Sequence, residues 1–453
     1  MKKLVIFHFG KRIVRFLTCA VALIMLMQTS CNKHFPPTLP TYVPKGDPWF
    51  SRNIYFPDHT DSTGRAAIVA ACCDSISAYL QRILPGTSTR CIVSYCPCDS
   101  SLINLDVSIV GLSGQTVPPP PPTTPKPGPT GDYTYMNNIN LEIPEATDTA
   151  FHYFDYDSTI KIPVNGTTES DSRVIAIIDT GLDTTRFTSR IGSLIWGLPG
   201  TGTIFSVIPN ESYFVLNDPN HVQHGTAVTG IVLNQIPDTK PKIMSIRAFD
   251  ARGGGSIYTV SCALSYAIKN HVNLINASWG YFGDVDSVLF KYISKASENG
   301  IPIIAAAGNT RGHHNPTSVC PTSENTTNDL SLPGRQLFYP GCFSTQFSNM
   351  VTVTTLASAG GELQLPCFYQ NYSNVFVNVG VLTKTGRQCC TFPHPSATDR
   401  LMEGSSFATP VVTGRMLNLI QASPGNTPRS IIDQVSEKTT GTKYTLNGSF
   451  IRF

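Results

Sequence analysis

Four polar residues in this sequence lie beside apolar or small-residue runs, and their types could together carry out acyl transfer. They are Asp179, His224, Asn309 and Ser406. A serine hydroxyl becomes a strong nucleophile when a histidine takes its proton and a carboxylate orients that histidine. A side-chain amide can then donate an N–H to the oxyanion that develops on the attacked carbonyl group. The four residues form one site only if the fold brings them together.

Each of the four residues also has a simpler interpretation. Ser406 could merely cap a helix, because it lies in a turn of small residues before an apolar run. Asn309 could end a turn, and His224 could be structural or bind a metal with His221, although a third ligand is not evident. The Asp-Thr-Gly sequence at Asp179 also suits an aspartic protease. That class needs two such loops, whose aspartates share a proton, and this sequence contains Asp-Thr-Gly only once.

Strands and helices are expected to alternate along the second part of the chain. Apolar, β-branched runs predict buried strands, and apolar residues spaced three or four apart predict helices between them. The strands are expected at residues 174–179, 242–249, 272–278 and 301–307, and helices are expected to open at Ser256 and Asp284. This pattern predicts an α/β fold, a three-layer sandwich with a mostly parallel central sheet. Active sites of such sheets lie at the carboxyl ends of the strands, where Asp179 and Asn309 are placed.

Four motifs resemble those of the subtilisin-like serine peptidases, in the order aspartate, histidine, serine. They are Ile-Ile-Asp-Thr-Gly at Asp179, His-Gly-Thr-Ala-Val-Thr-Gly from His224, Ala-Ala-Ala-Gly-Asn ending at Asn309, and Gly-Ser-Ser-Phe-Ala-Thr-Pro at Ser406. Ser278-Trp279-Gly280-Tyr281 resembles the family's substrate-binding strand, and Tyr372-Ser373-Asn374 resembles a further short segment. The resemblance covers about residues 172–413.

The resemblance implies both a mechanism and a subtilisin-like fold. It implies that Ser406 attacks the peptide carbonyl group and that His224 takes its proton and passes it to the leaving amine. It also implies that Asp179 stays ionised and orients the imidazole ring. Asn309 and the backbone N–H of Ser406 are implied to hold the oxyanion, and the substrate backbone is implied to bind along Ser278-Trp279-Gly280.

Several features depart from the family pattern. Ala227, Ser405 and Phe407 stand where the family usually has histidine, threonine and methionine. All three are interpreted as packing positions, so we expect them to alter fit more than mechanism. The segments Thr310–Phe338 and Glu362–Met402 are long and unfamiliar. By the resemblance, the first occupies chain that normally shapes the pocket for the residue before the cleaved bond, so cleavage preference is not predicted.

The chain has thirteen cysteines, a number that predicts disulfide bonds if the protein is exported. Five of them lie between residues 72 and 98, an odd number, so one is expected to remain a thiol or to pair outside this segment. Candidate pairs are Cys320 with Cys342, and Cys367 with Cys389 or Cys390. Cys96-Pro97-Cys98 could suggest a metal site, but histidines at a matching spacing are lacking, so disulfides are favoured.

Residues 1–30, which are followed by Cys31, resemble a bacterial lipoprotein signal peptide. Basic residues precede the apolar run Phe16–Met27, which is too short to span a bilayer, and Thr29-Ser30-Cys31 follows. Cys31 is therefore expected to be lipidated and to anchor an exported protein to a bacterial membrane. Gln28 departs from the aliphatic residue usual in such a signal. Ordinary cleavage and secretion is the alternative.

The composition divides the rest of the chain into four parts. They are a tether at residues 31–48, a small Cys-rich α+β unit at 49–115, a polyproline linker at 116–131 and the peptidase domain at 132–453. By the resemblance, the small unit is either a prodomain or a retained accessory module. The linker is expected to hold it at a distance from the cleft, which favours the accessory module.

The charge pattern narrows the list of partners. The net charge is +3 without long charged runs, so a nucleic-acid partner is not expected. Cofactors and metals are not expected either, and the predicted partners of a monomeric protein are polypeptide substrates and a membrane. The predicted function is an exported serine endopeptidase. The alternative is a catalytically inactive relative that binds peptides or proteins.

Overall fold

A computed structural model gives the structure of the protein. It describes residues 50–56, 61–110, 133–142, 161–164, 170–188, 191–197, 204–209, 211, 214–215, 218, 223–236, 240–310, 320–321, 323–358, 364–383, 389–395, 397–438 and 443–453. The predicted signal peptide with Cys31, the tether, the polyproline linker and His221 lie outside these residues. Within them, each helix is too short or too polar to cross a membrane.

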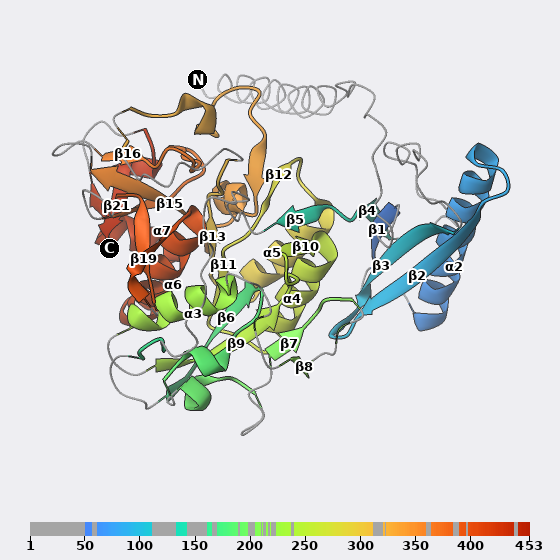
Figure 1. Ribbon diagram of the computed structural model, residues 1–453, viewed down its shortest axis with the longest axis horizontal. Helices are drawn as coiled ribbons and strands as arrows, with labels where there is room; N and C mark the ends of the chain where they lie inside the picture. Colours follow the sequence, from blue (N-terminus) through green and yellow to red (C-terminus); the bar gives the residue numbers. More distant parts are fainter. Residues whose placement is uncertain are drawn as a thin grey trace, which may run out of the picture.

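The N-terminal unit is a four-stranded antiparallel sheet covered by one helix (Figure 1). Its strands lie in the order β2-β3-β1-β4. Their bounds are β1 Phe50–Tyr55, β2 Ser88–Cys96, β3 Asp99–Val110 and β4 Thr134–Asn137. The helix α2, Ser62–Ile83, buries an apolar stripe against the sheet. Because β4 pairs with β1, the sheet extends past the boundary expected at residue 132.

The second unit is built on a mostly parallel sheet of eleven described strands. Its order is β20-β21-β17-β15-β13-β11-β6-β9-β7-β8, with β16 paired to β15. The bounds are β6 Ser170–Asp179, β7 Ile204–Ser206, β8 Phe214–Val215, β9 Lys240–Arg247, β11 Leu274–Ala277, β13 Ile303–Ala306, β15 Met350–Ser358, β16 Gln364–Pro366, β17 Val379–Leu382, β20 Glu437–Lys438 and β21 Ser449–Arg452. The four strands predicted from the sequence are confirmed as parallel neighbours β9, β6, β11 and β13.

Helices cover both faces of this sheet, so the predicted three-layer α/β fold is confirmed. One face packs against α3 His224–Asn234, α6 Ser405–Ala422 and α7 Pro428–Val435, and the other against α4 Ile257–Lys269 and α5 Ser287–Glu298. Ser256 caps α4 as predicted. The helix expected to open at Asp284 begins at Ser287 instead, because Asp286 caps it by accepting from two backbone N–H groups.

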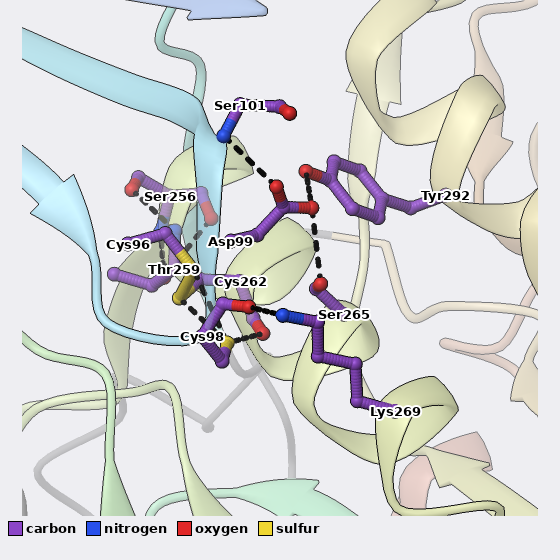
Figure 2. The surroundings of a disulfide bond; sticks show 10 residues. All are labelled: Cys96, Cys98, Asp99, Ser101, Ser256, Thr259, Cys262, Ser265, Lys269 and Tyr292. Carbon is purple, nitrogen blue, oxygen red and sulfur yellow. Dashed lines mark hydrogen bonds between the residues drawn. A yellow bond between two sulfur atoms is a disulfide. The ribbon is translucent and has the colours of Figure 1, made fainter. Parts of the chain in front are cut away.

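The N-terminal unit packs directly against α4 and α5. The Asp99 carboxylate accepts hydrogen bonds from the Tyr292 hydroxyl, at 2.7 Å, and the Ser265 hydroxyl, at 3.1 Å. A disulfide between Cys96 and Cys262 joins the end of β2 to α4 (Figure 2). The expectation that the linker would hold this unit at a distance is therefore wrong, because polar contacts and a covalent bond fasten it to the second unit.

Four disulfides are described. They are Cys73–Cys91, Cys96–Cys262, Cys320–Cys389 and Cys367–Cys390. The expected partner of Cys367 is confirmed, whereas the pairing of Cys320 with Cys342 is wrong. The reason is that the Cys342 thiol is buried in the hydrophobic core that the central sheet forms with α4 and α5.

A third cysteine lies beside the disulfide that joins the two units. The Cys98 sulfur lies 3.2 Å from that of Cys96 and 3.6 Å from that of Cys262. The three sulfurs are close enough to gather around one ion. Two of them are joined in the disulfide, however, and a metal requires thiolates.

Candidate active site

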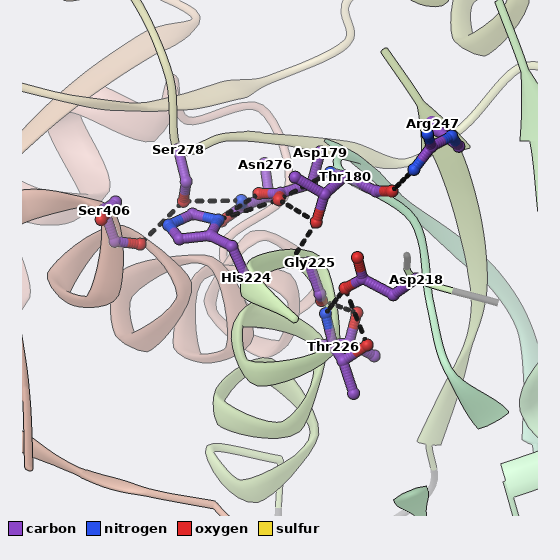
Figure 3. A network of polar contacts seen from close by, with 11 residues as sticks. Asp179, Thr180, Asp218, His224, Gly225, Thr226, Arg247, Asn276, Ser278 and Ser406 are labelled. Carbon is purple, nitrogen blue, oxygen red and sulfur yellow. Dashed lines mark hydrogen bonds and ion pairs between the residues drawn. The ribbon is translucent and has the colours of Figure 1, made fainter. Parts of the chain in front are cut away.

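Asp179 and His224 form a buried pair at the carboxyl end of the central sheet. Asp179 is the last residue of β6, which lies between β9 and β11. The Nδ1 atom of His224 lies 2.8 Å from Oδ1 of Asp179 and 3.1 Å from Oδ2. The backbone N–H of Thr180 donates to the same Oδ1 at 2.8 Å. The carboxylate therefore fixes the imidazole ring, and the opposite edge of the ring is turned toward Ser406 (Figure 3).

Gly225 allows α3 to begin beside the turn that follows β6. A Cβ atom at this position would lie 2.3 Å from the carbonyl oxygen of Gly181, so a side chain would displace the backbone. The N–H of Gly225 also donates to the Thr180 hydroxyl at 2.9 Å. The small residues of this motif thus place His224 in the first turn of the helix, as predicted.

Ser406 is the second residue of α6, so its backbone N–H has no acceptor within the helix. Gly404 precedes the helix with a φ of 138°, which side-chain-bearing residues rarely adopt. A Cβ atom on Gly404 would lie 3.2 Å from the Ser406 hydroxyl oxygen and 3.0 Å from Nδ2 of Asn309. The hydroxyl is buried and makes no hydrogen bond to any described residue. Catalytic hydrogen bonds are often long until a substrate binds, so this geometry is compatible with a nucleophile.

The side chain of Asn309, which follows β13, is held in one orientation. Its Oδ1 accepts from the backbone N–H of Ser405 at 3.0 Å and from the Ser405 hydroxyl at 3.1 Å. The same hydroxyl accepts from the N–H of Gly308 at 3.1 Å. Because Oδ1 is engaged on that side, the Nδ2 donor faces the space beside Gly404. Ser405, expected to be a packing residue, therefore also positions the amide.

Ser278, Trp279 and Gly280 leave β11 at the same edge of the sheet but differ in their contacts. The Ser278 hydroxyl donates to the backbone carbonyl oxygen of Ser406 at 2.8 Å (Figure 3). Trp279 is fully buried, with its side chain in the hydrophobic core. Gly280 is the last residue before β12, Tyr281–Gly283.

Further polar residues support the pair and were missed in the sequence. The buried Asp218 carboxylate accepts from the N–H and the hydroxyl of Thr226, at 3.0 and 2.9 Å. Burial raises the pKa of Asp218 to about 6, and the charge of Asp179 adds to this rise. Arg247, the last residue of β9, donates to the carbonyl oxygen of Thr180 at 2.7 Å. These residues act through neighbours that are distant in sequence, and no motif marked them.

A segment of the chain itself lies along the edge expected to bind substrate. This strand, β5 (Asn140–Glu142), pairs antiparallel with β10, Gly254–Ser256. It also contacts β12 (Figure 1). Leu141, at its centre, is buried in the hydrophobic core that the central sheet forms with α4 and α5. Since β12 directly follows Ser278-Trp279-Gly280, the extended strand β5 lies close to the segment predicted to bind substrate.

Comparison with known proteins agrees with this architecture. The family model described as the Subtilase family matches residues 170–450. The chain is 24% identical over 294 residues to subtilisin from Bacillus pumilus, which covers 62% of this chain and 90% of that protein. It is 23% identical over 192 residues to the minor extracellular protease Epr from Bacillus subtilis (strain 168), covering 40% of this chain and 26% of Epr. The chain thus spans about a quarter of the length of that relative.

Solved structures are also similar. A cold adapted subtilisin-like serine proteinase matches with a TM-score of 0.41 and 17% identity, over 63% of this chain and 91% of that one. The family model covers more than half of the chain and includes Asp179, His224, Asn309 and Ser406. The chain therefore belongs to the subtilase family of serine peptidases.

Proposed function

We propose that this protein is a serine endopeptidase that uses Asp179, His224 and Ser406, with Asn309 as oxyanion donor. The observation that supports it most is the buried Asp179–His224 pair, whose free ring edge is turned toward Ser406, the residue that carries the proposed nucleophilic hydroxyl. The oriented amide of Asn309 lies beside the same hydroxyl. Nucleophile, base, orienting carboxylate and oxyanion donor are the groups that acyl transfer requires.

The proposed reaction follows from these positions. Ser406 attacks the carbonyl carbon while His224 accepts the hydroxyl proton at the ring edge opposite Asp179. The negative charge that develops on the carbonyl oxygen is stabilised by Nδ2 of Asn309, by the backbone N–H of Ser406 and by the positive end of α6. His224 then protonates the leaving amine, and water hydrolyses the acyl-enzyme by the reverse sequence of proton transfers.

The proposed substrates are polypeptides bound in an extended conformation. The strand β5 supports this proposal, because it pairs with β10 and contacts β12 at the edge beside the site. A peptide that binds in the same way would add a strand through main-chain hydrogen bonds. The strand β5, which follows the N-terminal unit in the chain, is then an internal occupant of the cleft edge, as the prodomain alternative implies.

Labelling with a fluorophosphonate tests the proposed nucleophile. We expect the purified protein to be labelled at Ser406 and to cleave a peptide library, and Ser406→Ala to do neither while keeping its melting temperature. A folded wild-type protein that is neither labelled nor active would instead favour the inactive relative. Testing both the full chain and a preparation freed of its N-terminal unit separates a blocked cleft from an inactive site.

We also propose export and anchoring through a lipidated Cys31. The four disulfides support an oxidising compartment. Mass spectrometry of the mature protein tests this, with Cys31→Ser as the control. An acylated Cys31 at the mature N-terminus is expected, and an unmodified N-terminus elsewhere would contradict the proposal.

A further inference from the structure

The ring of Phe338 is wedged between two glycine backbones at the carboxyl edge of the sheet. Phe338 lies in β14, Leu337–Tyr339, which pairs antiparallel with β12. A Cβ atom on Gly280 would lie 2.4 Å from Cε1 of this ring, and one on Gly308 would lie 2.6 Å from its Cγ and Cδ2. Phe338 is only 3% exposed, so its ring is packed against both glycines and is closed off from solvent.

This space lies next to the bond that the site would cleave. Gly308 directly precedes the oxyanion donor Asn309, and Gly280 lies two residues after Ser278, which is bonded to the Ser406 backbone. The two glycines follow β11 and β13, which are neighbouring parallel strands. If the carbonyl oxygen of a substrate is held at Asn309, we expect the side chain of the residue that carries this oxygen to enter the space between these two strand extensions. Phe338 occupies that position.

We propose that Phe338 fills the subsite for the residue before the cleaved bond and limits it to glycine, alanine or serine. This inference rests on the proposed peptidase function and adds its substrate class. A larger side chain would need the ring to move, and the ring is confined by the backbones at Gly280 and Gly308. Phe282 only touches it edge-to-face, with ring centroids 5.0 Å apart. Close-packed interiors resist such insertion, so large residues are excluded.

Two peptide series that differ only at this residue test the proposal. The wild-type protein should show a kcat/KM for alanine that exceeds the one for phenylalanine by more than about 100-fold, since small differences in pocket volume already give 10–200-fold. Phe338→Ala should raise kcat/KM for the phenylalanine peptide by about 100-fold and change the alanine peptide by less than about 10-fold. Phe338→Leu, a milder truncation, should admit valine and leucine.

Phe282→Ala is the matched control, because it removes the same ring from the neighbouring strand but not from between the glycines. It should keep the wild-type preference. Wild-type cleavage after phenylalanine or leucine as fast as after alanine would overturn the inference. So would unchanged preferences in folded Phe338→Ala and Phe338→Leu proteins that still react with a fluorophosphonate. If no variant cleaves any peptide, the proposed function fails and this inference fails with it.

Discussion

Asn309→Ala tests the oxyanion assignment, and the structure predicts two separable effects. The substitution removes Nδ2, the donor that faces the space beside the Ser406 hydroxyl. Loss of one such donor from subtilisin lowers kcat by roughly 10²–10³-fold, or about 2.7–4 kcal/mol. We expect a loss of this size here, with little change in KM, because the donor acts on charge that exists only in the transition state.

The same substitution also removes Oδ1, which accepts two hydrogen bonds from Ser405. The Ser405 N–H is buried and would be left without this acceptor, which costs about 1–3 kcal/mol of folding free energy. Asn309→Ala should therefore fold but melt at a lower temperature. Ser405→Ala separates the two effects, since it keeps Nδ2 but removes one of the two bonds that orient it. We expect it to lower kcat by about 5–10-fold, equivalent to the ~1 kcal/mol of one hydrogen bond.

The assay is the pre-steady-state burst of an activated ester together with kcat/KM on a peptide, and thermal melting reports folding. Ser405→Thr should restore most of the activity lost in Ser405→Ala, because the hydroxyl returns. An Asn309→Ala enzyme that acylates as fast as the wild type would refute the assignment. A loss confined to KM would also refute it, because that result describes uniform binding and not transition-state stabilisation.

Three further changes have defined outcomes. Gly404→Ala should reduce activity by more than about 10²-fold, because the backbone φ of 138° disfavours a side chain and the added Cβ atom would lie 3.2 Å from the Ser406 hydroxyl oxygen. Active-site titration measures this loss, and full activity would contradict the geometry. Folding raises the pKa of Asp218 from its ordinary 3.8 to about 6. The free energy of unfolding of the wild type, measured in urea titrations, should therefore fall by roughly 3 kcal/mol as the pH rises from about 4 to 6, and then level off. Asp218→Asn should lack this fall. If the chain is cut between β5 and β6, the two fragments should run as one band on a denaturing gel until a reductant is added, because the Cys96–Cys262 disulfide joins them. Cys262→Ser should give two bands without reductant. Two bands from the unreduced wild type would exclude this disulfide.

Much of the fold could be predicted, because the peptidase unit relies on local signals. Buried parallel strands have continuous apolar runs, and these runs located β6, β9, β11 and β13 to within a few residues. The chemistry of the site was equally visible, since each side chain stands at a strand or helix end with its own short motif. What the sequence did not reveal is how the N-terminal unit sits. Its position depends on Asp99 and on a disulfide that spans 166 residues, and neither leaves a local pattern.

The proposed limit on substrate size shows most clearly why the rest could not be predicted from the sequence. The glycine of Ala-Ala-Ala-Gly-Asn was recognised as part of a motif, and Gly280 as part of another. A glycine at such a position indicates that something approaches the backbone closely, but not what approaches it. Phe338 lies 29 residues beyond Asn309, at the end of a segment without family resemblance, and reaches both glycines only because β14 pairs with β12. The catalytic residues could be predicted because the reaction requires particular residue types within short motifs. The proposed selectivity could not, because the reaction does not require any particular residue at position 338.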